Sequence, residues 1–372
     1  ALIIYLVIIV VLSTKWKKGS LSQQKGKNTF DYPVSLLVPF RNELENLPRL
    51  LANLESLTYQ SLQVILIDDY SQDRGAEYVQ EWIAAKGMPS FMLVKSQEEG
   101  KKAAIEQGVV VSNGFIILTT DADCLLPEDW VQNMLQPFND SKVQMVAGPV
   151  ISKGGKTKFD HFQQIDWAGI LLVTNFFFQI KKPVMCSAAN MGYRKEAFYH
   201  LRGYQGNSNQ LSGDDSFLLE KMSSKFGSEA IAYQPENEVL VKTAPAKTWR
   251  QFLSQRSRWA RKWNKHQFWE NAFGAIISAL LSTVSLLSFL LLFGGGIFPV
   301  LFVFYWGIKM LFEYIILKKV LDEYKIKLPV LSFAYASFFH PLYVVLVAIS
   351  SFWGKSTWKG RKGLSKVHYL NK

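Results

Sequence analysis

Short apolar runs, separated by segments with helical spacing, dominate the first two thirds of the chain. The runs are VSLLVPF, QVILIDD, SFMLVKS, GFIILTTDAD and QMVAGPV. Between them, segments such as ENLPRLLANLESL and AEYVQEWIAAKG repeat their apolar positions every three or four residues. Because strands and helices alternate, the pattern predicts an α/β fold with a mostly parallel sheet flanked by helices.

Longer apolar segments follow near the end of the chain. Residues 271–293 and 296–317 are each long enough to cross a bilayer, with GGG as the turn between them. Residues 328–353 are a third candidate, which we expect to be interrupted at His340 and Pro341. The softer apolar stretch 169–180 is expected in the core or on a membrane surface rather than across the membrane.

The chain opens with an apolar run of about a dozen residues that is followed by basic residues. We interpret residues 1–14 as a truncated transmembrane helix. A signal peptide is the alternative, but such a peptide carries its basic residues in front and ends in small residues. The positive-inside rule places the polar segment after this helix in the cytosol. Four full spans would then leave the basic tail 354–372 outside, so one apolar segment is expected to be re-entrant or interfacial.

Composition narrows the classes of partner. The 372 residues carry a net charge of +12, which favours nucleic acid, phospholipid headgroups or a phosphorylated substrate. Nucleic acid is disfavoured because the densest basic run adjoins apolar spans and no binding motif is present. Cys124 and Cys186 form neither a disulfide scaffold nor a zinc cluster, and the five histidines lack metal-binding spacing. These features favour a reducing compartment.

Acidic residues follow two of the apolar runs, in LIDDYSQD and LTTDADC. Ligands of a doubly wound sheet gather at the carboxyl ends of its strands, so these carboxylates are expected in one cleft. Asp121 and Asp123 are two residues apart and suit a hard divalent cation that also bridges phosphate oxygens. The alternative is that such aspartates only cap helices and form turns.

Two further segments carry candidate chemistry. In LSGDDSFLLEKM, Asp214 or Asp215 is a candidate general base, or no more than a helix N-cap. In EEGKKAAIEQG, Lys101 and Lys102 stand at a glycine-led helix start where a diphosphate could dock, although a solvated lysine pair is the alternative.

The segment QRSRWARKW, residues 255–263, combines basic residues with tryptophans just before the apolar spans. On a helix, Gln255, Arg258 and Trp259 share one face. The stretch from Lys242 to Lys265 holds eight basic and no acidic residues, as expected for a helix on an anionic membrane surface. We assign this surface role to four residues, namely Arg256, Arg261, Lys262 and Trp263.

In their order along the chain, these motifs closely resemble those of the membrane-anchored family-2 glycosyltransferases, the group that includes ceramide glucosyltransferase and the hyaluronan and cellulose synthases. The motifs are SLLVPFRNE, IDDYSQD, GKKAA, TTDADC, AANMGYRKEAF, GDDSFLL and QRSRW, between about residues 33 and 265, with WKGR in the tail. The resemblance implies an A-type glycosyltransferase fold.

The resemblance also implies roles for individual residues. Asp68 and Asp69 would hold the base and ribose of a nucleotide sugar, and Asp121 with Asp123 would bind Mg2+ or Mn2+, with Asp123 favoured as the direct ligand. Asp215 matches the catalytic base, with Asp214 as a rival because GDD departs from the usual TED or ED. Lys101 and the QxxRW residues Gln255, Arg258 and Trp259 would bind the donor, and residues 188–194 would line the acceptor side.

These roles divide the chain into six expected parts. They are an N-terminal transmembrane helix (1–14), a linker (15–30), a cytosolic glycosyltransferase domain (31–248), an interfacial helix with QxxRW (249–270), a C-terminal transmembrane region (271–353) and a basic tail (354–372). The expected function is transfer of a sugar, with inversion, from a UDP-sugar to a membrane lipid at the cytoplasmic face of a bacterial inner membrane. The alternatives are a processive polysaccharide synthase and a non-catalytic membrane scaffold.

Overall fold

The chain divides into two compact units. The structure is a computed structural model that describes residues 1–16, 32–207, 213–261, 269–353, 357–358 and 361–362. The first unit, which we call the sheet unit, comprises Ser22–Gly148, Met185–Gln234 and Lys355–Lys372. The second, the helical unit, comprises Ala1–Leu21, Pro149–Val184 and Pro235–Gly354. The segment 149–184, which the sequence places within the 31–248 domain, thus belongs to the helical unit.

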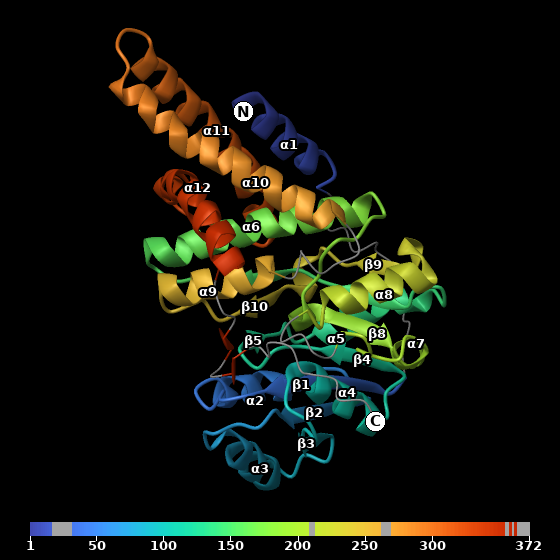
Figure 1. The fold of residues 1–372 in the computed structure, drawn as a ribbon. Coiled ribbons are helices and arrows are strands. Elements are labelled where there is room, and N and C mark those ends of the chain that lie inside the picture. The colour runs from blue at the N-terminus through green and yellow to red at the C-terminus, as the bar shows by residue number, and fades with distance from the viewer. Residues whose placement is uncertain (17–31, 208–212, 262–268, 354–356, 359–360, 363–372) are drawn as a thin grey trace, which may run out of the picture. The chain divides into compact units, whose positions relative to one another are not determined.

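A seven-stranded sheet forms the centre of the sheet unit, in the order β3-β2-β1-β4-β8-β6-β9 (Figure 1). Four of its six neighbouring pairs are parallel, and the two pairs that β8 makes with β4 and β6 are antiparallel. The predicted mostly parallel sheet is therefore confirmed. The strands are β1 (Val34–Phe40), β2 (Leu62–Asp68), β3 (Phe91–Lys95), β4 (Ile116–Thr119), β6 (Met145–Ala147), β8 (Met191–Arg194) and β9 (Ile231–Tyr233).

Helices of the sheet unit alternate with these strands. In α2 (Leu47–Glu55), the leucines at 47, 50, 51 and 54 are all buried, as their helical spacing predicts. β1 is buried at every position, so it reads as a continuous apolar run rather than an alternating one. The other elements are α3 (Gly75–Lys86), α4 (Lys101–Val111), β5 (Cys124–Leu125), α5 (Trp130–Leu135), η1 (Gln136–Asn139), η2 (Ala188–Asn190), α7 (Lys195–His200), α8 (Ser216–Phe226), η3 (Ser228–Ala230), β11 (Thr357–Trp358) and β12 (Arg361–Lys362).

The register of the sheet brings the carboxyl ends of its central strands level. Phe40 at the end of β1 pairs with Asp68 at the end of β2, which in turn pairs with Lys95 of β3. The backbone bonds continue one residue further, since Asp69 donates its N–H to Phe40 and Ser96 donates to Asp68. Residues that follow these strands are therefore held at one edge of the sheet, where such folds bind their ligands.

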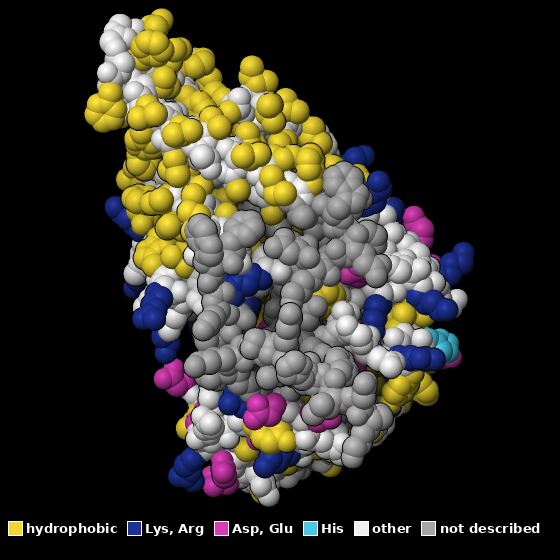
Figure 2. Space-filling view, viewed as in Figure 1, with side chains coloured by type: hydrophobic (Ala, Val, Ile, Leu, Met, Phe, Trp, Pro, Cys, Tyr) yellow, Lys and Arg dark blue, Asp and Glu magenta, His cyan; other side chains and the backbone are white. Residues whose placement is uncertain are grey.

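The helical unit contains three helices that are long and apolar enough to cross a membrane. They cover Phe273–Phe293, Phe298–Glu323 and Val330–Ser351. Hydrophobic side chains cover the exposed surface of the α10–α11 hairpin (Figure 2), as a lipid-facing surface requires. The elements of this unit are α1 (Leu2–Thr14), β7 (Val150–Ser152), α6 (Lys158–Gln179), η4 (Asn237–Val239), β10 (Val241–Thr243), α9 (Trp249–Ala260), α10 (Trp269–Leu287), η6 (Ser288–Phe293), α11 (Phe298–Glu323) and α12 (Val330–Trp353).

Helix α12 continues through Pro341, so the expected interruption at that point is wrong. Proline lacks an N–H, which leaves the carbonyl of the residue four positions earlier without its helical partner. That carbonyl belongs to Ser337, and it accepts a hydrogen bond of 3.1 Å from Nζ of Lys309 in α11. Lys309 Nζ also donates to Oγ of Ser337 at 3.1 Å and to Oε1 of Glu313 at 2.7 Å.

The apolar stretch 169–180 lies in α6, a helix largely buried within the helical unit. Its first turn is closed by a capping box, in which Thr157 accepts from the backbone of Asp160 and Asp160 accepts from the backbone of Thr157. α6 is not among the described helices that are long and apolar enough to cross a membrane. Of the two places expected for this stretch, the core and a membrane surface, its burial favours the core.

Candidate active site

Two adjacent aspartates at the end of β2 accept backbone hydrogen bonds. Oδ1 of Asp68 accepts from the N–H of Ser71 at 2.9 Å, and Oδ1 of Asp69 accepts from the N–H of Gly100 at 2.8 Å. Asp69 is only 1% exposed. Both side chains therefore shape the strand-end loops, and Asp69 links the β2 end to the start of α4.

Gly100 is the residue that makes this link possible. It is the N-cap of α4 and has a φ of 124°, a value that residues with a Cβ rarely adopt. Its N–H can therefore face Asp69 while the next residue, Lys101, begins the helix. The glycine-led helix start noted in the sequence is thus a backbone conformation that fixes the origin of the Lys101 side chain.

Lys101 lies between two carboxylates from distant parts of the chain. Its Nζ is 2.6 Å from Oδ1 of Asp121, which follows β4, and 2.8 Å from Oδ2 of Asp214, which precedes α8. Asp214 itself follows Gly213, whose φ is 94°. The structure thus brings three of the residues singled out in the sequence into one cluster, which we call the Lys101 cluster. The alternative of a solvated Lys101 is wrong, because its side chain is 18% exposed and ion-paired.

The electrostatics of the Lys101 cluster keep the lysine charged. Burial lowers the pKa of Lys101, but the charges of Asp121 and Asp214 raise it by more, so its pKa lies well above the ordinary value. Oδ2 of Asp214 is buried and lies 2.8 Å from Nζ of Lys101. Burial and then the charge of Asp214 raise the pKa of the Tyr193 hydroxyl, so this tyrosine stays neutral beside the cluster.

Lys102 is also buried rather than solvated. It is 5% exposed, and its Nζ donates to the carbonyl of Asn207 at 2.6 Å. The same ammonium lies 4.8 Å from the ring centroid of Phe217 in α8. Lys101 therefore contacts Asp121 and Asp214, whereas the ammonium of Lys102 lies against the Asn207 carbonyl and the Phe217 ring.

Asp215 forms the N-cap of α8. Its Oδ1 accepts from the backbone N–H of Ser216 at 2.6 Å and from the Ser216 hydroxyl at 3.0 Å. The N-cap interpretation of this acidic pair therefore applies to Asp215, whereas Asp214 faces Lys101. Capping uses one carboxylate oxygen, so it does not by itself decide which aspartate serves as a base.

Asp121 and Asp123 flank the buried Ala122 in the turn after β4. The turn is closed by a bond from the Cys124 N–H to the Asp121 carbonyl, and the Cys124 thiol lies 3.4 Å from Oδ1 of Asp123. The described residues contain no ready-made group of three or more His, Cys, Asp or Glu side chains around a metal position. The carboxylates of Asp121 and Asp123 are nevertheless partly exposed, and Lys101 lies between Asp121 and a buried oxygen of Asp214. Carboxylates are the hard oxygen ligands that Mg2+ and Mn2+ accept when phosphate oxygens complete the coordination shell.

The QxxRW residues lie on α9 of the helical unit. Gln255, Arg258 and Trp259 are all partly buried and, by their spacing, share one face of the helix. Arg256 was assigned to the membrane surface, and this is wrong because it is only 4% exposed. Arg261 is partly buried, and its Nη2 donates to the Ser350 carbonyl of α12 at 2.8 Å. The predictions for Lys262 and Trp263 fall outside the described residues.

Two residues that the sequence patterns did not single out hold the site loops in place. Arg41, in the PFRNE segment after β1, donates from Nη1 to the carbonyls of Asp69 at 2.9 Å and Tyr70 at 2.6 Å. Asn190, in the predicted acceptor segment, accepts from Nε1 of Trp130 at 2.9 Å and is fully buried. A basic residue directly after a strand and an asparagine within an apolar segment were the signals available in the sequence.

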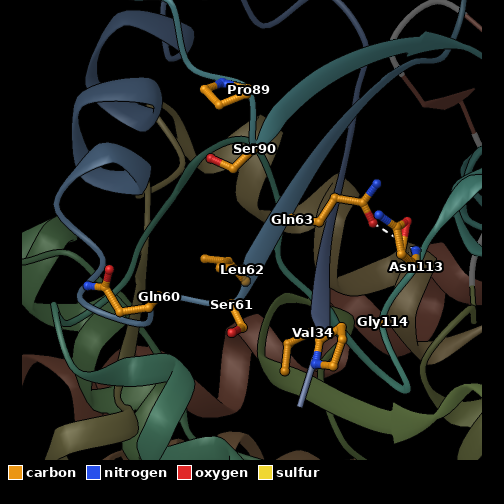
Figure 3. A pocket seen from close by; sticks show the side chains of 10 residues that line it. Val34, Gln60, Ser61, Leu62, Gln63, Pro89, Ser90, Asn113 and Gly114 are labelled. Atoms are coloured by element: carbon orange, nitrogen blue, oxygen red, sulfur yellow. Dashed lines mark hydrogen bonds between the residues drawn. The ribbon is translucent and has the colours of Figure 1, made fainter. Parts of the chain in front are cut away.

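A shallow cavity of about 320 Å³ lies at the other edge of the sheet (Figure 3). It is lined by the starts of β1 and β2, including Val34 and Leu62, and by Gln63, whose Oε1 accepts from the N–H of Asn113 at 2.9 Å. Ligands of such sheets bind at the carboxyl ends of the strands. The Lys101 cluster, rather than this cavity, is therefore the candidate active site.

A mostly parallel sheet with carboxylates at its strand ends and a lysine at a helix start is typical of α/β enzymes that bind phosphorylated ligands. Residues 35–202 match the family model described as Glycosyl transferase family 2. This match covers less than half of the chain. It includes Lys101 and the pairs Asp68–Asp69 and Asp121–Asp123, whereas Asp214 and Asp215 lie outside it.

Curated relatives match only part of the chain. Glycosyltransferase AglE of Haloferax volcanii is 29% identical over 119 residues, which are 32% of this chain and 39% of the relative. The undecaprenyl-phosphate 4-deoxy-4-formamido-L-arabinose transferase of Pseudomonas aeruginosa is 30% identical over 28% of this chain and 31% of the relative. The poly-beta-1,6-N-acetyl-D-glucosamine synthase of Staphylococcus aureus is 27% identical over 37% of this chain and 33% of the relative. The chain thus aligns with less than half the length of each.

One solved structure is similar over nearly the whole chain. It is the mannosyltransferase PcManGT of Pyrobaculum calidifontis in complex with GDP-Man and Mn2+, with a TM-score of 0.55 and 18% identity. The similarity covers 95% of this chain and 94% of the other. It confirms the expected A-type glycosyltransferase fold.

Proposed function

We propose that the chain is an inverting glycosyltransferase that moves a sugar from a nucleotide diphosphate, with UDP favoured, to a membrane lipid. The observation that carries this proposal is the placement of Lys101 between Asp121 and Asp214 at the carboxyl edge of the sheet. There, a charged lysine and hard oxygen ligands surround the position that a donor diphosphate would occupy. The family 2 domain match supports the same chemistry.

The donor would be held by residues from several strand ends. Asp68 and Asp69 would bind the nucleoside, and Lys101 the diphosphate. Asp123, with Asp121, would hold Mg2+ or Mn2+, which when bound offsets the negative charge that develops on the leaving diphosphate. On the QxxRW face, Gln255 and Trp259 would contact the donor, and Arg258 would supply a planar, two-pronged donor to the same phosphates.

Deprotonation of the acceptor requires one base. We assign this role to Asp215, which would take the proton of the acceptor hydroxyl as that oxygen bonds to the anomeric carbon and the bond to the diphosphate breaks. Attack from the face opposite the diphosphate inverts the configuration. Asp214 is the alternative base, but its carboxylate already pairs with Lys101.

A lipid acceptor is supported by the membrane-type helices and by the relatives. Three described helices are long and apolar enough to cross a membrane. One relative is named as a transferase acting on undecaprenyl phosphate. We therefore place the protein in the bacterial inner membrane as a multi-pass protein, with the sheet unit on the cytoplasmic side.

A processive polysaccharide synthase is the second candidate, and the poly-beta-1,6-N-acetyl-D-glucosamine synthase among the relatives favours it. Three candidate spans in the described residues give little material for a polymer channel within one chain. The third candidate is a non-catalytic scaffold. Such a protein would have no need of Asp123, Asp215 and Arg258, all of which are present.

The test is a transfer assay on the purified protein in nanodiscs of total bacterial lipid. Mn2+ or Mg2+ is added with a panel of radiolabelled UDP- and GDP-sugars, and label is followed into organic-soluble and polymeric fractions. A discrete organic-soluble product with inverted anomeric configuration is the expected result. Label in polymer would support the synthase instead, and no transfer from any donor would support the scaffold.

A further inference from the structure

A buried ion pair joins two helices of the helical unit. Nε and Nη2 of Arg256 in α9 both donate to Oδ2 of Asp166 in α6, at 3.0 and 2.7 Å. The two side chains are 4% and 7% exposed. The other carboxylate oxygen, Oδ1, is 3.8 Å from Nε2 of His340 in α12. The carboxylate therefore links α6 to α9 and lies beside α12.

The guanidinium of Arg256 is enclosed by aromatic rings. Its central carbon lies 4.2 Å from the ring centroid of Trp259, and 4.8 Å from those of both Trp167 and Phe252. Trp167 packs edge-on against Trp259, with centroids 5.5 Å apart and an angle of 72°. Trp259 is thus contacted by a cation from its own helix and by an indole from α6, so its ring is fixed from two directions.

Stability alone does not account for this pair. The desolvation of two buried charges usually offsets their attraction, and an apolar replacement is often as stable. Here the cost is larger still, because Nη1 of Arg256 is buried without a hydrogen-bond partner among the described residues. An ion pair with defined geometry does restrict orientation, since a planar guanidinium stacks on one indole face while its edge is fixed by the carboxylate.

We propose that Asp166 and Arg256 are positioning residues that set the orientation of Trp259 for sugar transfer. This inference rests on the proposed function, in which the QxxRW face contacts the donor. Arg256 acts through Trp259 and does not itself touch substrate. Arg256 therefore differs in role from Arg258, because Arg256 orients Trp259 whereas Arg258 would contact the donor phosphates.

A double-mutant cycle on transfer tests this role. Arg256→Lys keeps the charge next to Asp166 but removes the stacked plane, and we expect it to lower kcat/KM by about tenfold or more. In a Trp259→Phe background, the same change should lower kcat/KM less than about twofold, because the side chain through which Arg256 acts is gone. Equal losses in both backgrounds would overturn the proposal.

A destabilised control separates positioning from folding. Thr157→Ala removes the N-cap of α6, the helix that carries Asp166, without touching α9. We expect it to lower the melting temperature and leave the transfer rate at a permissive temperature unchanged. If Thr157→Ala reduced kcat/KM as much as Arg256→Lys, the loss would reflect weakened packing of α6 and the proposal would fail.

A spectroscopic measurement makes the test independent of activity. In 5-fluorotryptophan-labelled protein, the 19F resonance of Trp259 is assigned by its loss in Trp259→Phe. Arg256→Lys and Asp166→Asn should each shift this resonance, while Thr157→Ala should not. An unmoved resonance would overturn the positioning role whatever the enzyme transfers. A shifted resonance in a protein that transfers nothing would reject the proposed function, and it would keep only the finding that Asp166 and Arg256 fix the orientation of Trp259.

Discussion

The ammonium of Lys101 lies 2.8 Å from the carboxylate of Asp214. The two residues are far apart along the chain, because the strands β4, β6 and β8 lie between them in the sequence. The contact exists because Gly100 and Gly213 each adopt a positive φ and aim the following residue at the same point. The two glycines thus determine where the candidate site carries its positive charge.

Replacing Lys101 by methionine should weaken donor binding. The variant keeps the side-chain length but removes the charge, so the diphosphate loses a charge-assisted contact and its affinity should fall by roughly tenfold to a hundredfold. Titration of a nucleotide diphosphate by calorimetry measures this change. Lys86→Met is the matched control, because Lys86 forms an exposed ion pair with Glu55 at 2.8 Å and its loss should change binding little. Equal affinity in both variants would remove Lys101 from the donor site.

Asp214 and Asp215 should respond differently to conversion to asparagine. Asp215→Asn keeps a side chain that can cap α8, so the protein should fold and bind donor while kcat falls by about a hundredfold or more. Asp214→Asn removes a charge next to Lys101 and should weaken donor binding as well as lower the rate. Single-turnover rates at saturating donor separate the two effects. An unchanged rate in Asp215→Asn would transfer the base assignment to Asp214.

Metal dependence should be lost with Asp123. We expect chelation of divalent ions to abolish transfer by the native protein, and Asp123→Ala to abolish it even with Mn2+ or Mg2+ present. The affinity for donor, measured with and without metal, provides a second readout. Normal metal-dependent donor affinity in the variant would contradict the role of Asp123 as a ligand.

Gly100→Ala should harm both stability and donor binding. A φ of 124° is strained for alanine, and relief of that strain would move the N–H away from Asp69. We expect a loss of about 1–3 kcal/mol in stability together with weaker donor binding. Gly87→Ala offers a control, because Gly87 has a φ of 59° at the end of α3 and nothing near its Cβ position. That variant should lose stability and bind donor normally.

Glu236 should make stability depend on pH. Burial, helped by the charges of Glu238 and Glu323, raises the pKa of Glu236 above its ordinary value of 4.5, although a bond from its own backbone lowers it. The folded state therefore binds more protons than the unfolded state above pH 4.5, so this group's contribution to stability falls as pH rises through its folded pKa. Glu236→Gln should raise the melting temperature at pH 7 and not at pH 4. A gain that is independent of pH would contradict this account.

Much of the architecture could be predicted from the chain. The runs that predict the first four strands became β1 to β4, since a buried parallel strand needs a continuous apolar segment. QMVAGPV instead contains β6 and the first residue of β7, and these two strands belong to different units. The rule that the carboxyl ends of parallel strands meet at one edge accounts for the place of Asp121 in the Lys101 cluster. It does not account for Asp214, which precedes α8 and does not follow a parallel strand.

The surroundings of Arg256 could not be predicted in this way. Helical spacing shows which residues share a face, but the partner of Arg256 is on α6, 90 positions away in the chain. From the sequence alone, a cationic side chain next to apolar spans is expected at the membrane surface. Only the packed structure shows that a carboxylate compensates the burial of Arg256. The role of Arg41 was hidden for the same reason, as it depends on carbonyls of the next loop.

The proline of α12 affects how α11 and α12 can enter a bilayer. An ammonium has three N–H groups, and those of Lys309 match the Ser337 carbonyl, the Ser337 hydroxyl and the Glu313 carboxylate one to one. The carbonyl is available only because Pro341 does not use it. Lys309 and Pro341 are each costly alone in hydrocarbon, yet each removes part of the other's cost once α11 and α12 have associated. The two helices are therefore expected to insert as a pair. Replacing Lys309 alone or Pro341 alone by an apolar helix former should impair insertion more than replacing both together.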